Sequence, residues 1–437
     1  MAFKEISLPW GQGALSCRIP ENNLGEVLSP NARPPLGGLD AAIANALDAP
    51  IGLAPMSEWV KPGHKVLLIS DDNTRLTPAH LILPPLLQRL NRYGVPDADI
   101  TILMALGTHR YMTEAEMEAK VGAAVYKRVR TVNHLWQDKA NLADLGRTGQ
   151  GTPLTVNRLL TESDVIIALG AIVPHHIPGY SGGSKIIQPG VCGPETTAET
   201  HLLSCEGGGD SFLGQVDNLV RRDMDEMAAK VGLNAIFNVV LDHDGQALGV
   251  FFGHYQAAFR AGAKLSREVY GVPYRVEPDI VLVNSWPCEI DFWQAHKSMY
   301  PGQIMVKPGG VIIVTTPCPE GISPVHTDLI EFTAWSSRDI KEGYRAGKIK
   351  NGVAAALAIA WAQVREKAGV ITYSPGLSLA EKQALGHTAA AGLDEAVAMA
   401  LAEQGPNSVI SVLTHAPDLL PILVPSMAGH GAGGRAG

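Results

Sequence analysis

Reactive side chains are concentrated in one short segment of this 437-residue chain. Residues 175–185 read HHIPGYSGGSK, and His201 follows the lysine of this segment by sixteen residues. A lysine amine can form a covalent link, and a neutral imidazole can bind nickel, zinc, copper or iron or accept a proton near neutral pH. Together these residue types meet the needs of a metal-bearing cofactor that is tethered to the chain.

The lysine of this segment also invites comparison with a phosphate-binding loop. That motif requires glycine before the lysine and serine or threonine after it. Here Ser184 precedes Lys185 and Ile186 follows it, so the sequence argues against a P-loop. A single loop histidine is usually a surface or hydrogen-bonded residue. A functional role for these histidines is therefore supported only if other polar clusters lie near them.

Two further clusters follow apolar runs that we predict to be strands. Residues 71–75 read DDNTR and come directly after a run that ends at Ser70. Residues 107–110 read GTHR and come after a run that ends near Ala105. The histidine pair at 175 and 176 follows a third apolar run. Ligands bind at the carboxyl ends of parallel strands, so we expect these clusters to meet in one crevice.

A fourth cluster lies in the second half of the chain. Residues 291–297 read DFWQAHK, which places Gln294 and Lys297 three residues apart and on one face of a helix. An amide donor and a cation in this arrangement can hold a carboxylate. Trp361, in an alanine-rich helical stretch, is by itself typical of a core aromatic residue.

The elements that must position these clusters alternate along the chain. Short aliphatic or β-branched runs are separated by alanine-rich helical patterns, which is the sequence form of parallel βαβ architecture. The predicted strands are residues 65–70, 100–105, 165–169, 235–241, 280–283, 311–315 and 409–413. We therefore predict an α/β protein of two domains with mostly parallel sheets and an active site in the cleft between the domains.

Pattern and composition also suggest where the domains divide. We predict an N-terminal α/β domain over residues 1–273, which carries the lysine and the histidines, and a C-terminal α/β domain over residues 274–405. Residues 406–426 are predicted to pack back on the N-terminal domain. Residues 427–437 are rich in glycine and alanine and are predicted to be a disordered tail.

Composition limits the classes of partner and location. The net charge is -8 and the pI is near 6.0, which argues against nucleic-acid binding through clustered Lys and Arg. The five cysteines form no C-x-x-C pair, which indicates a reducing compartment. No apolar run reaches the roughly 18 to 20 residues of a membrane helix. We expect a soluble, cytoplasmic protein with a small-molecule partner.

Taken together, the clusters resemble the nickel-dependent lactate racemase family. The family pattern contains D-x-T-R, G-T-H-R and P-H-x-x-x-G-[FY]-S-G-G-x-K segments, a histidine sixteen residues beyond that lysine, and a Q-x-x-K helix. This chain has all five in order, and the likeness runs from about Lys61 to the helix of Trp361. Five ordered motifs with matching spacing are far more specific than any one of them.

The resemblance implies a nickel-pincer nucleotide, pyridinium-3,5-bisthiocarboxylic acid mononucleotide, as cofactor. It would be linked through a thioamide to Lys185, with nickel held by two sulfurs, a ring carbon and His201. The attachment would also explain the glycines at 182 and 183, because larger side chains beside the lysine would clash with the nucleotide. Asp72 and Thr74 would contact its ribose and phosphate, and Trp361 would pack near it.

The same resemblance implies a racemase or epimerase of a 2-hydroxy acid. His109 and His175 would be the two acid/base residues on opposite sides of the substrate carbon, and Arg75, Gln294 and Lys297 would orient its carboxylate. One base would take the hydroxyl proton while hydride leaves C2 for the cofactor. Return of hydride to the other face of the planar 2-oxo acid would invert the centre. The enzymes that build the cofactor would be transient partners.

Three positions depart from the family pattern. Ser184 stands where relatives often have a basic residue, His176 stands where an aromatic residue is common, and His296 lies inside the Q-x-x-K turn. These changes do not affect the cofactor residues, but they argue against lactate as the substrate. Relatives act on malate and sugar acids, and a polar side chain such as His296 would serve a longer or more polar substrate.

Two other functions remain open at this point. The first alternative is a non-catalytic homologue that senses a nucleotide or hydroxy acid. The joint presence of His109, His175, Lys185 and His201 speaks against it. The second alternative is a zinc hydrolase with the three histidines of this set as ligands. Lys185 would then have no evident role.

Overall fold

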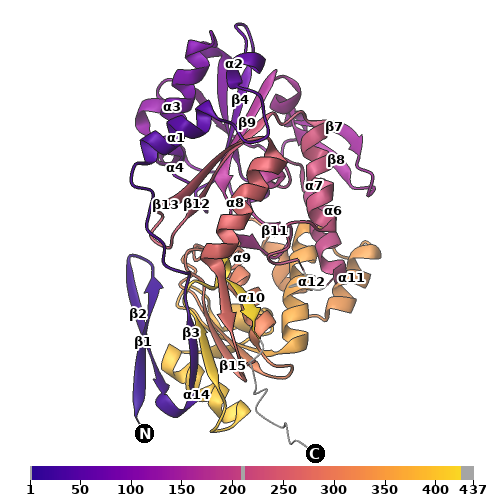
Figure 1. The fold of residues 1–437 in the computed structure, drawn as a ribbon. Helices are drawn as coiled ribbons and strands as arrows, with labels where there is room; N and C mark the ends of the chain where they lie inside the picture. Colours follow the sequence, from indigo (N-terminus) through magenta and orange to yellow (C-terminus); the bar gives the residue numbers. More distant parts are fainter. Residues whose placement is uncertain (1, 208–211, 425–437) are drawn as a thin grey trace, which may run out of the picture.

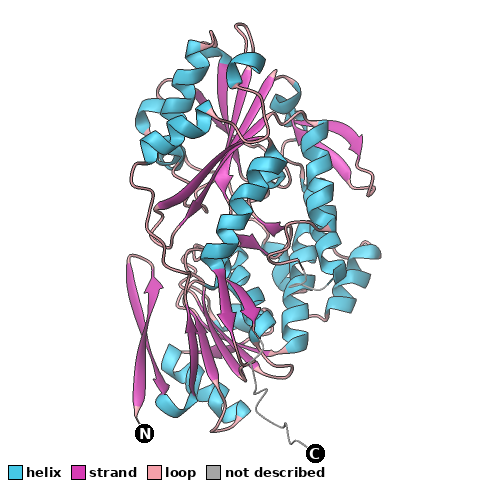
Figure 2. Cartoon of the chain, in the orientation of Figure 1, coloured by secondary structure: helices cyan, strands magenta, loops and turns pink. Residues whose placement is uncertain are grey.

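The computed structural model describes residues 2–207 and 212–424. It confirms an α/β protein with two domains, each built on a six-stranded sheet (Figures 1 and 2). All seven predicted runs form strands. The predicted tail at 427–437 lies outside the described residues.

The sheet of the first domain has the strand order β13-β12-β9-β4-β5-β6. Its strands are parallel except for the antiparallel pair β12 and β13. Their bounds are β4 Val66–Asp71, β5 Ile100–Ala105, β6 Arg130–Asn133, β9 Val165–Ala171, β12 Ala235–Leu241 and β13 Ala247–Gly253.

Alternation along these strands buries both faces of the sheet. In β4, Val66 and Leu68 point to one helical layer, whereas Leu67 and Ile69 point to the other. The first layer contains α1 Leu39–Asp48, α3 Ala79–Arg92 and α4 Glu114–Val121, and the second contains α7 Leu219–Lys230 and α8 Tyr255–Tyr270. Smaller elements of this domain are α2 Met56–Trp59, α5 Ala123–Tyr126 and the hairpin of β7 Leu142–Arg147 with β8 Pro153–Asn157.

The sheet of the second domain has the order β18-β17-β16-β15-β19-β3 and is parallel throughout. Its strands are β3 Leu24–Leu28, β15 Ile280–Asn284, β16 Val311–Thr315, β17 Gly369–Tyr373, β18 Thr388–Ala390 and β19 Ile410–Leu413. One face is covered by α10 Met299–Met305 and α12 Gly352–Lys367, and the other by α14 Leu393–Gln404. The remaining helices here are α9 Phe292–Ala295, α11 Ser337–Arg345 and α13 Leu379–Ala384.

The N-terminal boundary of the first domain is a correction to the prediction. The hairpin of β1 Phe3–Trp10 and β2 Gly13–Pro20 packs on the second domain, and β3 forms the edge of the second sheet beside β19 (Figure 1). The chain therefore begins in the second domain and only then enters the first. Strand pairing over hundreds of residues depends on which hydrophobic edge is free, and a local pattern does not carry that information.

The segment 406–426 is a second correction. We predicted that it packs on the N-terminal domain, but β19 pairs with β15 inside the second sheet. The following strand, β20 Leu420–Leu423, pairs with β14 Gly271–Tyr274, where the chain returns from the first domain. Ile410 and Val412 are buried in the hydrophobic core of the second domain, which explains why this segment belongs to that domain.

Helix α6 Pro194–Ser204 joins the two domains. It follows the lysine segment of the first domain but packs along α12 of the second (Figure 1). Ala198 of α6 belongs to the second hydrophobic core. The approach is close at Gly352, where a Cβ would lie 2.8 Å from the Cβ of Ala198. No helix among the described residues is long and apolar enough to cross a membrane.

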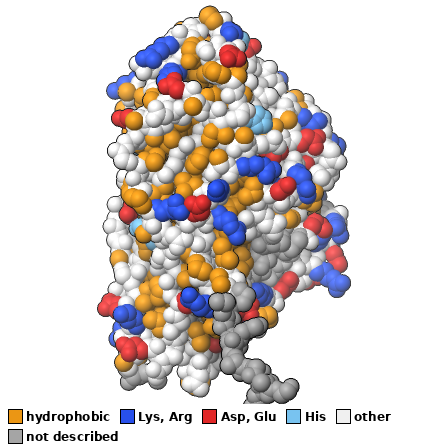
Figure 3. All heavy atoms as spheres, in the orientation of Figure 1, with side chains coloured by type: hydrophobic (Ala, Val, Ile, Leu, Met, Phe, Trp, Pro, Cys, Tyr) orange, Lys and Arg blue, Asp and Glu red, His pale blue; other side chains and the backbone are white. Residues whose placement is uncertain are grey.

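Acidic and basic side chains are interspersed with apolar ones on the face drawn in Figure 3. No extended field of one sign covers that face, which agrees with the modest net charge of -8.

The placement of the N-terminal hairpin predicts the effect of a core substitution. Leu8 is fully buried against the second domain, so Leu8→Ala is expected to lower the free energy of unfolding by about 2–5 kcal/mol. Ser7→Ala, on the exposed side of the same strand, is the matched control and should change it by less than about 0.5 kcal/mol. Urea unfolding followed by circular dichroism measures both. Equal midpoints for Leu8→Ala and the wild type would contradict this packing.

Candidate active site

Three central strands of the first sheet end at one edge. β9, β4 and β5 are neighbours and run parallel, so the residues after them meet, as the sequence predicted. The first domain supplies Asp72, His109 and His175 at this edge, and the second domain faces them with residues of its own.

The two sets enclose a cavity of about 110 Å³ in the cleft between the domains. Its lining includes most of the predicted site residues: Asp72, Arg75, His109, His175, Lys185, His201, Gln294 and Lys297. The structure thus brings together clusters that are separated by more than two hundred residues in the chain.

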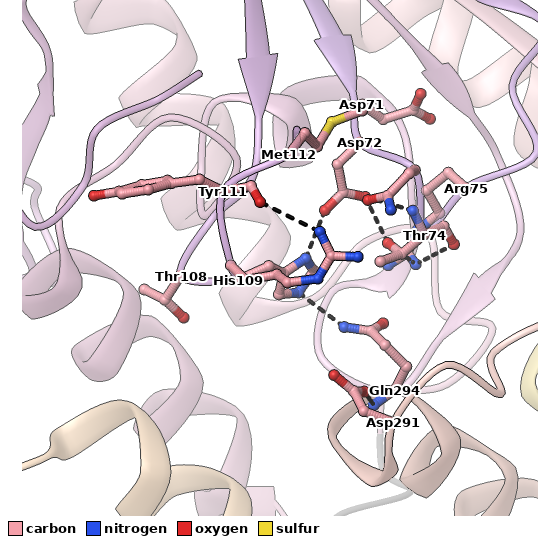
Figure 4. A network of polar contacts seen from close by, with 12 residues as sticks. Asp71, Asp72, Thr74, Arg75, Thr108, His109, Tyr111, Met112, Asp291 and Gln294 are labelled. Atoms are coloured by element: carbon pink, nitrogen blue, oxygen red, sulfur yellow. Dashed lines mark hydrogen bonds and ion pairs between the residues drawn. The ribbon is translucent and has the colours of Figure 1, made fainter. Parts of the chain in front are cut away.

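His109 is held at both ring nitrogens (Figure 4). Its Nδ1 lies 2.6 Å from Asp72 Oδ2, and its Nε2 lies 2.9 Å from Gln294 Nε2. Asp72 is in turn fixed by Thr74, whose hydroxyl donates to Asp72 Oδ1 at 2.5 Å. A carboxylate accepts and an amide nitrogen donates, so the imidazole carries its proton on Nδ1 and a lone pair on Nε2.

The charges of this pair follow from its surroundings. Burial raises the pKa of Asp72, but the charge and hydrogen bond of His109, together with Arg75 and Thr74, hold it well below the ordinary value. Burial lowers the pKa of His109, and the opposing effect of Asp72 does not fully offset it. The pair is therefore an ionised carboxylate that orients a neutral imidazole.

His175 has the opposite tautomer. It lies in β10 Pro174–His175, which pairs with β11 Gly179–Tyr180, and its Nδ1 accepts the backbone N–H of Ile177 at 3.2 Å. The neutral ring then has its proton on Nε2. Burial, and after it the charge of Lys185, lowers the pKa of His175 well below 6.5. The two predicted acid/base residues thus line one cavity with different nitrogens engaged.

The lysine loop is held by two buried side chains that the sequence gave no reason to select. Arg221 of α7 donates to the carbonyl of Gly182 at 3.0 Å and lies 4.1 Å above the ring of Phe259. Asn238 of β12 accepts the N–H of Gly183 at 2.8 Å. These contacts fix the short 3-10 helix Gly183–Ile186 that carries Lys185.

The glycine pair in this loop has a structural cause that is independent of the predicted nucleotide. Gly182 and Gly183 have φ values of +73° and +59°, which residues with a Cβ rarely adopt. A Cβ at Gly182 would lie 2.6 Å from Ile172 and 2.7 Å from Asn238. Backbone conformation and protein packing therefore already require the glycines, without a nucleotide.

The cations of the cavity outnumber its free anions. The lining contains Arg75, Lys185 and Lys297, and its two carboxylates are engaged: Asp71 with Lys120 at 2.8 Å and Asp72 with His109. Among the described residues, Arg75 makes no ion pair within 4.0 Å. The site is accordingly prepared for an anion such as a carboxylate or phosphate.

Lys185 and Lys297 both respond to this excess of positive charge. Burial lowers the pKa of Lys185 well below 10.5, and Arg75 and Lys297 reinforce the effect. Burial and then Arg75 lower the pKa of Lys297 to about 8. Lys297 donates to Gln294 Oε1, which orients the amide toward His109. Lys185 therefore gives up its proton more readily than an exposed lysine does, whereas Lys297 remains mostly a cation near neutral pH.

His201 can offer a ring nitrogen as a metal ligand. It lies on α6 beside the cavity, with the Thr197 backbone close to its ring. Burial, and after it Lys185, lowers its pKa to about 3, so the imidazole is in the neutral form that metals bind. No group of three or more His, Cys, Asp or Glu in the described part of the chain is arranged to hold a metal. A zinc hydrolase site with three protein ligands therefore finds no support.

Two predicted cofactor residues lie outside the cavity lining. Thr74 supports Asp72 and Arg75: its hydroxyl donates to the former, and it accepts from Arg75 Nη1 at 3.0 Å. Trp361 is fully buried and packs edge-on against Phe292 at 5.3 Å. Val353 and Leu357 of the same helix line the cavity, but Trp361 lies one layer behind His296. Trp361 is thus a core residue in this structure, and its contact with the cofactor stays a prediction.

The cleft is closed by contacts that motif analysis missed. Arg110 bonds Glu320 of the second domain through both carboxylate oxygens, at 2.9 and 3.0 Å, and also pairs with Glu116. His326 stacks on Trp293 at 4.1 Å and reaches the Thr108 carbonyl at 3.1 Å. The arginine of the GTHR motif was a possible signal, but its partner is 210 residues away.

The comparisons with known proteins agree with this geometry. The family model described as lactate racemase N-terminal domain matches residues 10–210. Lactate racemase of Lactiplantibacillus plantarum is 31% identical over 321 residues, which are 72% of this chain and 75% of that protein. The chain belongs to the lactate racemase family. Lactate racemase of Thermoanaerobacterium thermosaccharolyticum is 29% identical with the same coverage.

Solved structures extend the match to the lactate racemase fold as a whole. The lactate racemase apoprotein of T. thermosaccharolyticum has a TM-score of 0.85 and 26% identity, and the alignment covers 96% of this chain and all of that one. A Thermotoga maritima protein shares the fold at a TM-score of 0.71 and 21% identity, over 88% of this chain and 98% of its own. As a lactate racemase family member, the chain is an isomerase.

The electrostatics of Lys185 predict an unusual reactivity. Cyanate carbamylates the neutral form of an amine, which is rare for exposed lysines near pH 7 because their ordinary pKa is about 10.4. Lys185 is partly open to the cavity and its pKa lies well below 10.5, so a larger fraction of its amine is neutral than in an exposed lysine. Peptide mass spectrometry should show stronger labelling of Lys185 than of exposed lysines near pH 7, with the ratio falling as pH rises toward about 10. A constant ratio would show that Lys185 is an ordinary protonated amine.

Proposed function

We propose that the chain inverts C2 of a 2-hydroxy acid by hydride transfer to and from a nickel-pincer nucleotide linked to Lys185. The observation that carries the proposal is the presence of His109 and His175 in one cavity with different nitrogens engaged. A racemase needs an acid/base group for the hydroxyl of either enantiomer. Such a pair has no use in a protein that only binds its ligand.

The residues present fit the proposed cofactor. Lys185 is the amine to which it would be linked, and a ring nitrogen of His201 would bind its nickel. A single free histidine is sufficient because the cofactor brings its own sulfur and carbon ligands. When bound, the group supplies the hydride acceptor and donor that no side chain of this chain provides. Cofactor-building enzymes would be transient partners.

Arg75 and Lys297 would bind the substrate carboxylate. Both are cations in a cavity whose own carboxylates are engaged, and Gln294 lies beside them. Arg75 is held by Thr74 through its Nη1, which leaves other guanidinium N–H groups for a ligand. Fixing the carboxylate at one end of the substrate determines where its hydroxyl lies relative to the histidines.

His109 would take the hydroxyl proton with Nε2. Asp72 holds the proton of His109 on Nδ1 and stabilises the imidazolium that forms. In the free protein Gln294 donates to this Nε2, so the substrate hydroxyl must replace that amide. The amide can then turn to the substrate carboxylate, which is the role predicted for Gln294.

His175 would deliver a proton from Nε2 to the other face and must first be an imidazolium, which requires Nδ1 to take up a proton and give up the N–H of Ile177. The charges of Lys185, Lys297 and Arg75 now lower its pKa. Acylation of Lys185 removes one of these charges, and a bound carboxylate offsets the other two. Both changes raise the pKa of His175 toward its ordinary value. Binding of the cofactor and the substrate would thus allow His175 to take up the proton that it must donate.

The first test is covalent loading and racemisation. Protein co-produced with the cofactor biosynthetic enzymes should show an adduct mass on Lys185, absent from Lys185→Arg, and should racemise a single-enantiomer 2-hydroxy acid as judged by chiral chromatography. His109→Gln should lower kcat by about 10²- to 10⁴-fold. His80→Gln, on the exposed surface, is its control and should retain full activity. An unmodified mass from such cells would refute the proposal, and retained turnover in His201→Ala would refute nickel binding by that residue.

A second test uses the pKa of Lys297, which is about 8. The ammonium form binds the carboxylate, so affinity is complete below this pKa and is lost as pH rises through it. KM for a 2-hydroxy acid should therefore rise up to tenfold per unit above pH 8. Lys297→Arg stays charged, so its KM should remain flat to pH 9.5. Parallel profiles for the two proteins would show that Lys297 does not bind the carboxylate.

A further inference from the structure

Two histidines outside the proposed chemistry lie side by side at the cavity. His176 is stacked between His175, at 4.7 Å between ring centroids, and Tyr300, at 3.9 Å. His296 meets His176 edge-on at 5.4 Å and Trp361 at 5.3 Å. His176 and His296 both line the same cavity as Lys297 and His109.

The polar atoms of this pair are buried and incompletely paired. His176 is 6% exposed and His296 is 2% exposed. Nε2 of His176 has no hydrogen-bond partner among the described residues, and the ring of His296 has only long contacts with the Phe292 and Trp293 carbonyls, which satisfy at most one of its nitrogens. Each unsatisfied buried group costs about 1–3 kcal/mol. Both rings line the cavity, so a ligand bound there can supply the missing hydrogen-bond partners.

Both rings are neutral. Burial, then His296 and Lys297, lowers the pKa of His176 well below 6.5. Burial and Lys297 lower the pKa of His296 likewise, against a weaker opposite effect of the Trp293 and Phe292 carbonyls. Each neutral imidazole therefore presents one N–H donor and one lone pair.

These properties select among the groups that a 2-hydroxy acid can carry beyond C2. A methyl group, as in lactate, offers no partner to either ring. A second carboxylate accepts hydrogen bonds but cannot donate to a lone pair. A hydroxyl group both donates and accepts, so it matches two neutral imidazoles.

We propose that His176 and His296 form the binding site for a hydroxyl group on the substrate chain beyond C2. The substrate class is then 2,3-dihydroxy acids and longer polyhydroxy acids. This inference rests on the proposed racemase function and adds to it the feature that selects the substrate.

Glycerate and lactate form a matched pair for the test, because they differ by one hydroxyl on C3. With cofactor-loaded wild-type protein, kcat/KM for racemisation should be at least about tenfold higher for glycerate, since one hydroxyl relieves at least one unpaired group. Malate carries a carboxylate in the same region and serves as the third substrate. Equal values for glycerate and lactate, or a preference for malate, would overturn the proposal.

Variants assign the preference to the two rings. His176→Phe keeps an aromatic ring in the stack, and His296→Leu removes only the polar edge beside it. Each should reduce the glycerate-to-lactate ratio toward one. Tyr300→Phe is the matched control, because its hydroxyl is also buried but the residue does not line the cavity, and it should leave the ratio unchanged. An unchanged ratio in both histidine variants would overturn the assignment.

Binding to the cofactor-free protein separates failure of this inference from failure of the proposed function. Calorimetric titration should show tighter binding of glycerate than of lactate, and His296→Leu should remove the difference. If no acid is racemised by loaded protein, the proposed function fails, and this titration still decides the hydroxyl site. If all three acids are racemised at equal rates, the function stands and the hydroxyl site is wrong.

Discussion

The burial of three cations around a cavity whose carboxylates are already engaged is the constraint on which the site depends. Arg75 lowers the pKa of both lysines, and Lys297 also lowers that of Lys185, while burial removes the water that would screen these charges. This arrangement is costly in the free protein. Acylation of Lys185 and binding of an anion would relieve it, so the proposed cofactor and substrate would both stabilise the site.

The two-domain architecture supplies the rigidity that such a site requires. The carboxyl ends of β9, β4 and β5 present the polar residues of the first domain at one edge. Arg221 and Asn238 hold the lysine loop from behind, and Arg110 bonds Glu320 across the cleft. Helix α6 carries His201 while packing into the second domain. The geometry of the proposed site therefore depends on how the domains meet, and a shift between them would displace His201 and the proposed carboxylate-binding residues together.

The residues for chemistry and the residues for substrate choice come from different parts of the site. His109, His175 and Lys185 match the lactate racemase pattern, and their contacts are set by the first domain and Gln294. His176 and His296 depart from that pattern, and their unpaired nitrogens lie beside the same cavity. Substitution at these two positions changes which groups a substrate can satisfy, without altering the loop that carries the lysine. A family with one chemistry can change its substrates in this way.

The sequence by itself determined the elements and the chemical residues of this protein. Strand runs such as 100–105 and 311–315 are read from local apolar patterns, and the motifs around His109, His175, Lys185 and Gln294 are read from residue type and spacing. Only the tertiary structure decided that β1 to β3 belong to the second domain, that Trp361 packs behind His296, and which tautomer each histidine adopts. The reason is physical: pairing, burial and proton position depend on contacts between distant residues, which local patterns do not specify.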